Sequence, residues 1–209
     1  MNLRTKIVMK TGASIALTMV LGCTQEIADD EPEATTADEI NSAPRVYVSD
    51  ACEPFDDTTY QLRRYELGAK TISATWVRYA DAECSPASKL ATIVMSGSAN
   101  VTSLSAQVLG AVNISVHIAE KTILPESQAG VDMLATLCAP GRYAFEPGVS
   151  QAVTTGCGPL LQQDDDCPTE YDLLRFARGE RIFYGDRSRP LCRREDRPRA
   201  LSAYAVHRE

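Results

Sequence analysis

The sequence predicts an all-β fold, an antiparallel meander that forms a barrel or a sandwich and is braced by disulfides. Short segments of period-two alternation recur from residue 59 to residue 207. Turn-forming residues separate neighbouring segments, and we find no amphipathic helix of 12 residues and no internal repeat. Six cysteines fall within residues 46–209, the region that holds these segments.

The clearest strand is predicted over residues 112–121, VNISVHIAEK. Alternation places one set of side chains on an apolar face: Val112, Ile114, Val116 and Ile118. His117 falls on the polar face, as in a half-buried strand. A second strand is predicted over residues 71–79, in which Trp76 shares a face with Ile72 and Ala74 and is expected to be a core residue.

Several hairpins are predicted from the turn residues. Residues 59–67 and 71–79 flank Gly68-Ala69. Residues 91–97 and 101–109 flank residues 98–100, and residues 171–177 and 181–185 flank residues 178–180. Residues 201–207 complete the meander, whereas residues 104–112 and 132–137 are compatible with helix as well.

The N-terminus predicts export. Arg4, Lys6 and Lys10 precede an apolar run over residues 12–21, which is the arrangement of a signal peptide. The run is shorter than the roughly 20 apolar residues that span a bilayer. Residues 20–23, Val-Leu-Gly-Cys, resemble the bacterial lipobox. The resemblance implies a signal peptide over residues 1–22 and lipidation of Cys23; the alternative is an ordinary signal peptide with an incidental cysteine.

The lipobox resemblance also implies a location. Thr24 rather than aspartate follows Cys23, which in the Gram-negative sorting pattern implies the outer membrane. We therefore expect a lipid-anchored protein that faces the periplasm or the cell surface, because two or three acyl chains hold a protein stably at a membrane. The lipobox resemblance therefore implies the membrane as a partner, through the N-terminal lipid anchor.

An acidic tether is predicted over residues 23–45, followed by a single β domain over residues 46–209. The tether has seven acidic residues, one arginine and no aromatic residue, so it cannot bury enough apolar surface to fold by itself. The full chain has a net charge of −7, and removal of the three basic residues of the signal leaves −10. This charge argues against nucleic acid as a partner.

The cysteines beyond Cys23 are even in number: Cys52, Cys84, Cys138, Cys157, Cys167 and Cys192. In an exported domain they predict three disulfides, and six cysteines allow about 15 pairings. Proximity favours Cys157–Cys167, and we expect Cys52–Cys84 and Cys138–Cys192 as the other two. The chain has no C-x-x-C motif and only two histidines, which argues against zinc and against redox catalysis.

The second half of the chain resembles a group of bacterial lipoproteins of unknown function, sometimes described as adhesin-like, whose sheet domains are similar to calycins, the lipocalin-like barrels. The matching residues are Tyr79, Asp81, Cys84, Gly141, Tyr143, Cys157-Gly158, Cys167, Tyr171, Gly179, Ile182, Gly185 and Arg197-Pro198. The resemblance implies a lipocalin-like barrel and no particular activity. Trp76 lacks the glycine two residues earlier that lipocalins have, so no lipocalin ligand site is carried over.

No catalytic or cofactor motif is present, and we predict neither an enzyme nor a cofactor or metal. The acidic clusters are Asp56-Asp57, residues 164–166, and Glu170 with Asp172. They fall at expected turns or strand starts, where acidic residues are common. Residues 164–166 could offer oxygen ligands to calcium, but they lack the spacing of an EF-hand loop, and a solvated turn is expected.

The C-terminal region is rich in arginine. From Arg175 to Glu209 there are ten arginines, no lysine and five acidic residues. Arg193, Arg194 and Arg197 are the candidates for contact with anionic partners such as lipid headgroups or acidic glycans. The alternative, which we favour, is that the arginines pair within the protein.

Two functions remain open from the sequence. The first is a lipid-anchored binding or interaction module, either adhesin-like or an envelope partner. The second is a carrier of a small apolar ligand in a lipocalin-like cavity, for which we expect an enclosed apolar pocket of roughly 300 Å³ or more. An interaction module should instead have a filled core and an exposed patch.

Overall fold

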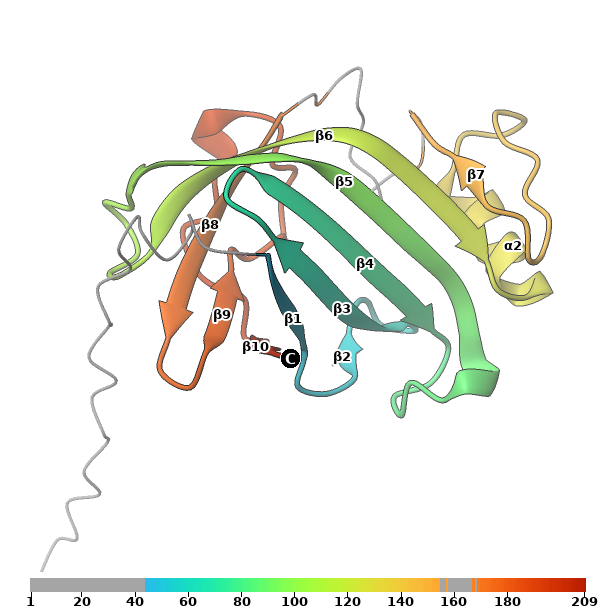
Figure 1. Ribbon diagram of the computed structural model, residues 1–209. Helices are drawn as coiled ribbons and strands as arrows, with labels where there is room; N and C mark the ends of the chain where they lie inside the picture. Colours follow the sequence, from blue (N-terminus) through green and yellow to red (C-terminus); the bar gives the residue numbers. More distant parts are fainter. Residues whose placement is uncertain (1–43, 155–156, 158–166, 168) are drawn as a thin grey trace, which may run out of the picture.

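Eight antiparallel strands close into a barrel in the computed structural model, which describes residues 44–154, 157, 167 and 169–209 (Figure 1). The strands follow the chain around the ring, and the pairing of β1 with both β10 and β3 closes it. The meander is therefore confirmed, and it forms a barrel rather than a sandwich. The strands are β1 (Arg45–Ser49), β3 (Tyr60–Leu67), β4 (Thr71–Tyr79), β5 (Lys89–Leu104), β6 (Val112–Pro125), β8 (Thr169–Ala177), β9 (Arg181–Tyr184) and β10 (Val206–Arg208).

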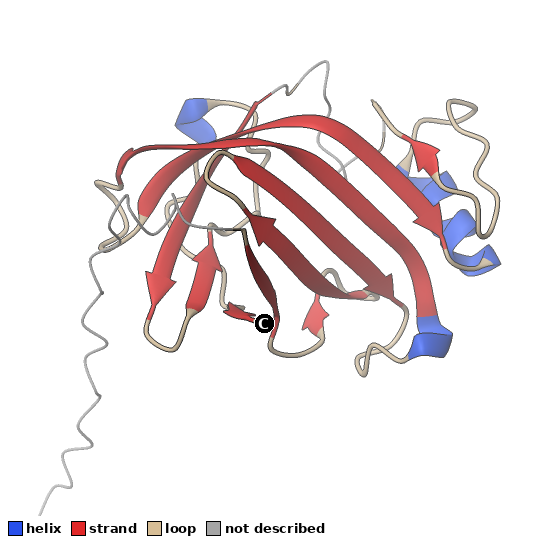
Figure 2. Ribbon diagram, viewed as in Figure 1, coloured by secondary structure: helices blue, strands red, loops and turns tan. Residues whose placement is uncertain are grey.

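Short elements lie around this barrel (Figure 2). Strand β2 (Glu53–Pro54) pairs with β3, and β7 (Gln151–Ala152) pairs with the end of β6. Helix α2 (Gln128–Leu137) follows β6, and two 3₁₀ turns, η1 (Pro86–Ser88) and η3 (Arg194–Asp196), lie in loops.

The predicted alternation is confirmed in β6 and β4. The apolar face of β6 is buried from Val112 to Ile118, whereas His117 is exposed. In β4, Ala74 and Trp76 are buried and face the lumen. The hairpins around Gly68-Ala69 and residues 178–180 are also present, because β3 pairs with β4 and β8 with β9.

The hairpin predicted around residues 98–100 is wrong. Strand β5 continues through these residues, and its ladder with β6 shifts register at Ser96/Gly97 and again at Val101/Ser103. A side chain at Gly97 would overlap the carbonyl oxygen of His117, so the two strands approach there too closely for any residue but glycine. The chain reverses instead over residues 105–111, where Ser105 Oγ accepts hydrogen bonds from the amides of Gln107 and Val108. Neither the strand beyond Leu104 nor the alternative helix over residues 104–112 is formed.

The helical alternative for residues 132–137 is confirmed by α2. Ser127 caps the helix: its Oγ accepts from the Gly130 amide at 3.2 Å and donates to the Lys89 carbonyl at 3.0 Å. Any side chain at Gly130 would overlap the Leu90 backbone. Cap and glycine together hold α2 against the start of β5.

Three disulfides join Cys52 to Cys84, Cys138 to Cys157, and Cys167 to Cys192. The first pairing was predicted, and the pairings Cys157–Cys167 and Cys138–Cys192 are wrong. The sheet explains the error. Strand β7 holds residues 151–153 beside the end of β6 and thus near α2 and Cys138. Strand β8 instead pairs with the first half of β6, and its Tyr171 amide bonds to the carbonyl of Leu191, next to Cys192.

Candidate functional site

The two ends of the barrel lumen differ in size and chemistry. Near the β3–β4 turn lies a space of about 40 Å³, which we call the apolar end. At the opposite end a cleft of about 520 Å³ opens to solvent, which we call the mouth. The apolar end is lined mainly by Tyr47, Leu67, Ile72, Ile114, Leu174, Phe176 and Tyr184. The mouth is lined by charged and aromatic side chains, among them Glu53, Phe55, Arg63, Tyr65, Trp76, Arg78, Arg187 and Tyr204.

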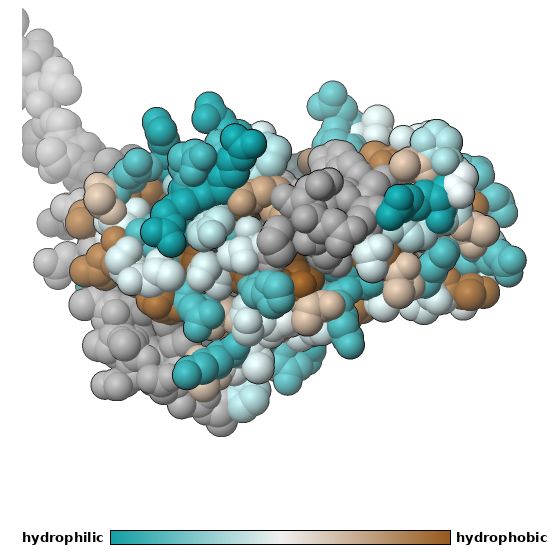
Figure 3. Space-filling view, turned by 90° about the horizontal axis from the view of Figure 1, so that it is seen from above, coloured by the Kyte–Doolittle hydropathy of each residue, from teal (hydrophilic) through white to brown (hydrophobic). Residues whose placement is uncertain are grey.

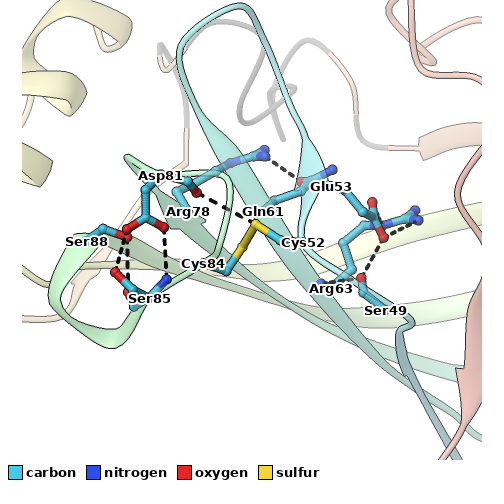
Figure 4. Close-up of a disulfide and its surroundings, with 10 residues drawn as sticks. All are labelled: Ser49, Cys52, Glu53, Gln61, Arg63, Arg78, Asp81, Cys84, Ser85 and Ser88. Carbon is cyan, nitrogen blue, oxygen red and sulfur yellow. Dashed lines mark hydrogen bonds and ion pairs between the residues drawn. A yellow bond between two sulfur atoms is a disulfide. The ribbon is translucent and has the colours of Figure 1, made fainter.

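Four segments of the chain build the mouth. The hairpin of β3 and β4 supplies Arg63 and Arg78, the loop after β9 supplies Arg187, and the residues around β2 and residues 201–204 form the rim. The Cys52–Cys84 disulfide ties the β1–β2 loop to the β4–β5 connection. Figure 4 shows this disulfide beside the contacts of Arg78 and Arg63, so a covalent bond holds the rim next to the arginines.

Arg63 is held by a buried ion pair. Its Nε lies 2.8 Å from Glu53 Oε2, and its Nη2 donates to Glu53 Oε1 and to the Tyr204 carbonyl, both at 3.0 Å. Ser49 Oγ donates to the same carboxylate at 2.6 Å. Burial acts to lower the pKa of Arg63, but the neighbouring Tyr65 and Glu53 outweigh it and raise the pKa. The pair therefore stays charged and fixes β3 to the β2 rim.

Arg187, whose side chain is 33 % exposed, reaches two carboxylates that are buried in the barrel. Its Nη2 lies 2.9 Å from Asp172 Oδ2 and 3.2 Å from Glu170 Oε2. Burial raises the pKa of Asp172 above its usual value, against the opposing attraction of Arg187. Burial alone would lower the pKa of Arg187, and Glu170 and Asp172 instead raise it. The guanidinium carbon of Arg187 also lies 5.2 Å from the Trp76 ring centre, within cation–π range.

Arg78 differs from both neighbours. It is fully buried, its Nη1 donates to Gln61 Oε1, and its guanidinium lies 3.3 Å from the Phe55 ring centre. Within the part of the chain that the structure describes, its Nε and Nη2 have no hydrogen-bond partner and no carboxylate lies within ion-pair distance. Burial lowers the pKa of Arg78 to about 9, because the charged form is costly without a counter-charge.

The middle of the lumen is filled. Tyr65 stacks on Tyr184 with ring centres 4.3 Å apart, and Trp76 Nε1 donates to Tyr65 Oη at 3.2 Å. The space beside these rings is about 30 Å³. This space and the one at the apolar end are far smaller than ligand pockets, which span roughly 300–1,000 Å³. Within the lumen, the volume suited to a ligand therefore lies at the mouth.

The predicted arginines lie outside the mouth, at and after η3. Arg193 and Arg194 are exposed, and Arg194 lies 5.8 Å from the Tyr171 ring centre. Arg197 is an internal brace, because its Nη1 donates to the carbonyls of Ile114 and Asp172 at 2.9 and 2.7 Å. Figure 3 shows strongly hydrophilic side chains over the half of the upper face where β8 and η3 lie.

The other predicted positions are partly described. Asp56 caps a turn by accepting from the amides of Thr58 and Thr59, as expected for a turn aspartate. Glu170 and Asp172 do start a strand, but they are buried against Arg187. Cys23 and residues 164–166 lie outside the described residues.

The described residues contain no group of three or more histidine, cysteine, aspartate or glutamate side chains that could hold a metal ion. None of the helices in that part of the chain is long and apolar enough to cross a membrane.

Sequence reasoning missed Arg63 and Arg78, although a signal was present. In TISATWVRY the alternation that puts Ile72, Ala74 and Trp76 on one face puts Arg78 on that face too. In YQLRRYEL, Arg63 likewise shares the face of Tyr65. An arginine on the predicted inward face of a strand is the pattern to search for.

Comparison with known proteins adds no relative: no protein family matches the chain, and no curated protein matches it significantly.

Proposed function

We propose that this protein is a lipid-anchored binding module of the bacterial envelope that holds a small ligand in the mouth of its barrel. The mouth carries this proposal: it is a cleft of about 520 Å³ in which arginines and aromatic side chains converge. Pockets of this size with a few convergent polar groups are the usual sites of small-molecule binding.

The sequence left two functions open, a lipid-anchored binding module and a carrier of a small apolar ligand. Our proposal is a binding module whose small ligand is not purely apolar. An apolar ligand would need the apolar end or the middle of the lumen, where the spaces are about 40 and 30 Å³. The mouth instead presents charged groups beside rings, which suits a ligand with both polar and flat apolar parts.

The single tryptophan of the chain provides the test, because Trp76 lines the mouth. In the ¹⁵N-labelled protein its indole N–H gives one resolved NMR signal. We expect that signal to shift with a subset of a mixed library of neutral, cationic and anionic aromatic small molecules. The Ala203→Trp variant, which fills the mouth, should lose these responses; its additional indole signal is identified by comparison with wild type.

Two results would contradict ligand binding at the mouth. One is an indole signal that no library member shifts. The other is a set of shifts of unchanged size and affinity in the Ala203→Trp variant, which would place binding elsewhere.

The anchor is tested separately. Cys23→Ser should move the protein from the membrane fraction to the soluble fraction, and intact-mass analysis of the wild type should find acyl groups on residue 23. A wild type without acyl groups, together with a variant that still pellets with membranes, would exclude the lipid anchor. Ligand binding at the mouth would be unaffected by that outcome.

A further inference from the structure

Arg78 is the one mouth arginine whose charge is not neutralised among the described residues. Arg63 is paired with Glu53, and Arg187 is shared by two carboxylates. Asp56 acts on Arg78 only through longer-range attraction. A buried cation without a counter-ion is costly, and Arg78 lacks such a partner among the described residues.

The free groups of Arg78 have a specific geometry. Nε–H and Nη2–H lie along one edge of the planar guanidinium and point in nearly the same direction, which is the fork that a carboxylate accepts with both oxygens. These are the two nitrogens that lack partners, and both are buried beside the mouth, whereas Gln61 occupies Nη1 on the other side. The unpaired positive charge of Arg78 and its two unpartnered N–H groups therefore both point to a carboxylate as the ligand group.

The surroundings favour a flat ligand. Phe55 stacks on the guanidinium, and the ring centre of Trp76 lies 5.8 Å from it. Tyr204 lies on the rim and is 41 % exposed. Aromatic rings pack well against such side chains and against guanidinium planes.

We propose that the mouth binds a small aromatic monocarboxylate, whose carboxylate pairs with the Nε and Nη2 of Arg78. This inference rests on the proposed function and names its ligand class. A monoanion fits because it supplies one negative partner to the guanidinium of Arg78; a dianion such as an aryl phosphate would bring a second charge into a cleft that already holds Glu53 and Asp186.

The experiment compares two probes of the same shape, trans-cinnamate and trans-cinnamamide, on the mature protein in mild detergent. Titrations are followed by the Trp76 indole signal and by calorimetry. We expect cinnamate to bind about 10- to 100-fold more tightly than the amide, as is typical when a charged hydrogen-bonded pair is lost. Phenyl phosphate, which carries two negative charges, should bind more weakly than cinnamate.

Arg78→Met should weaken cinnamate binding to the level of the amide. Its melting temperature should be equal to or higher than that of the wild type, because the variant removes a buried unpaired charge. Arg189→Met is the matched control, since Arg189 is exposed and does not line the mouth. It should bind cinnamate as the wild type does.

Three results would overturn the inference. They are equal affinity of cinnamate and cinnamamide, full cinnamate binding by Arg78→Met, or indole shifts with neutral and cationic molecules but not with carboxylates. In each case ligand binding at the mouth still stands. If no molecule shifts the signal, the inference and the proposed function both fail.

Discussion

The apolar end and the mouth are built from the same strands, yet they bury opposite chemistry. Along the inward face of β4 the side chains change from Ile72 and Ala74 to Trp76 and then Arg78. Along β8 they change from Phe176 and Leu174 at the apolar end to Asp172 and Glu170 deeper in the lumen. A few residues thus separate a hydrophobic core from a charged cleft.

The two ends are stabilised differently. At the apolar end each buried methylene contributes about 0.8 kcal/mol without needing a specific partner. Toward the mouth each buried charge costs free energy unless it is paired, so the arrangement of partners decides stability. Asp172 and Arg187 satisfy this condition, whereas Arg78 does not among the described residues. The difference between the two ends teaches that a buried charge without a partner, such as Arg78, does not stabilise the fold and is therefore a candidate for ligand binding.

Asp172→Ala should produce the largest loss of stability. Asp172 Oδ1 accepts from the Leu173 and Gly185 amides at 2.7 and 3.1 Å, and Oδ2 pairs with Arg187. The variant loses these hydrogen bonds and leaves Arg187 with Glu170 alone, so we expect the free energy of unfolding to fall by about 3 to 5 kcal/mol.

Urea unfolding measures this loss. Glu66→Ala is its control, because the Arg64–Glu66 pair is half exposed and separated by 3.8 Å. That variant should change the free energy of unfolding by less than about 0.5 kcal/mol. Similar losses in the two variants would show that the charges of the lumen are no more coupled to folding than those of the surface.

Leu174→Ala probes the apolar end. Leu174 is 5 % exposed and belongs to the hydrophobic core. Its truncation should lower the free energy of unfolding by about 3 kcal/mol through lost transfer energy and the cavity left behind. Thermal and urea unfolding measure the loss, and cinnamate affinity measured under native conditions should stay unchanged. A variant that loses ligand affinity instead would mean that the two ends are not independent.

Arg197→Ser should have the smallest effect of the three. Arg197 bonds two carbonyls of β6 and β8 from outside the lumen and is partly exposed. We expect a loss of about 1 to 2 kcal/mol, because its two hydrogen bonds are charged but reach the solvent side. Arg193→Ser, a change at an exposed neighbouring residue, should leave the melting temperature unchanged. Equal melting temperatures of the two variants would return Arg197 to the candidates for contact with anionic partners.

The sequence by itself determined what depends on local backbone geometry. Because successive side chains of a strand point to opposite faces, the buried face of β6 and the core position of Trp76 could be predicted. The same rule places Arg78 on the inward face of β4, where the structure has it buried. Cys52–Cys84 was also predicted, as were the hairpins around Gly68-Ala69 and residues 178–180.

Only the tertiary structure decided which residues meet. Barrel closure brings Gln61, Arg78 and Arg187 to one cleft although more than a hundred residues separate the last two. Pairing with β6 makes residues 98–100 part of a long strand, and the pairing of β7 and β8 with different halves of β6 separates Cys157 from Cys167. Register and closure depend on the energy of the whole sheet, so a local pattern fixes the face of a side chain but not its partners.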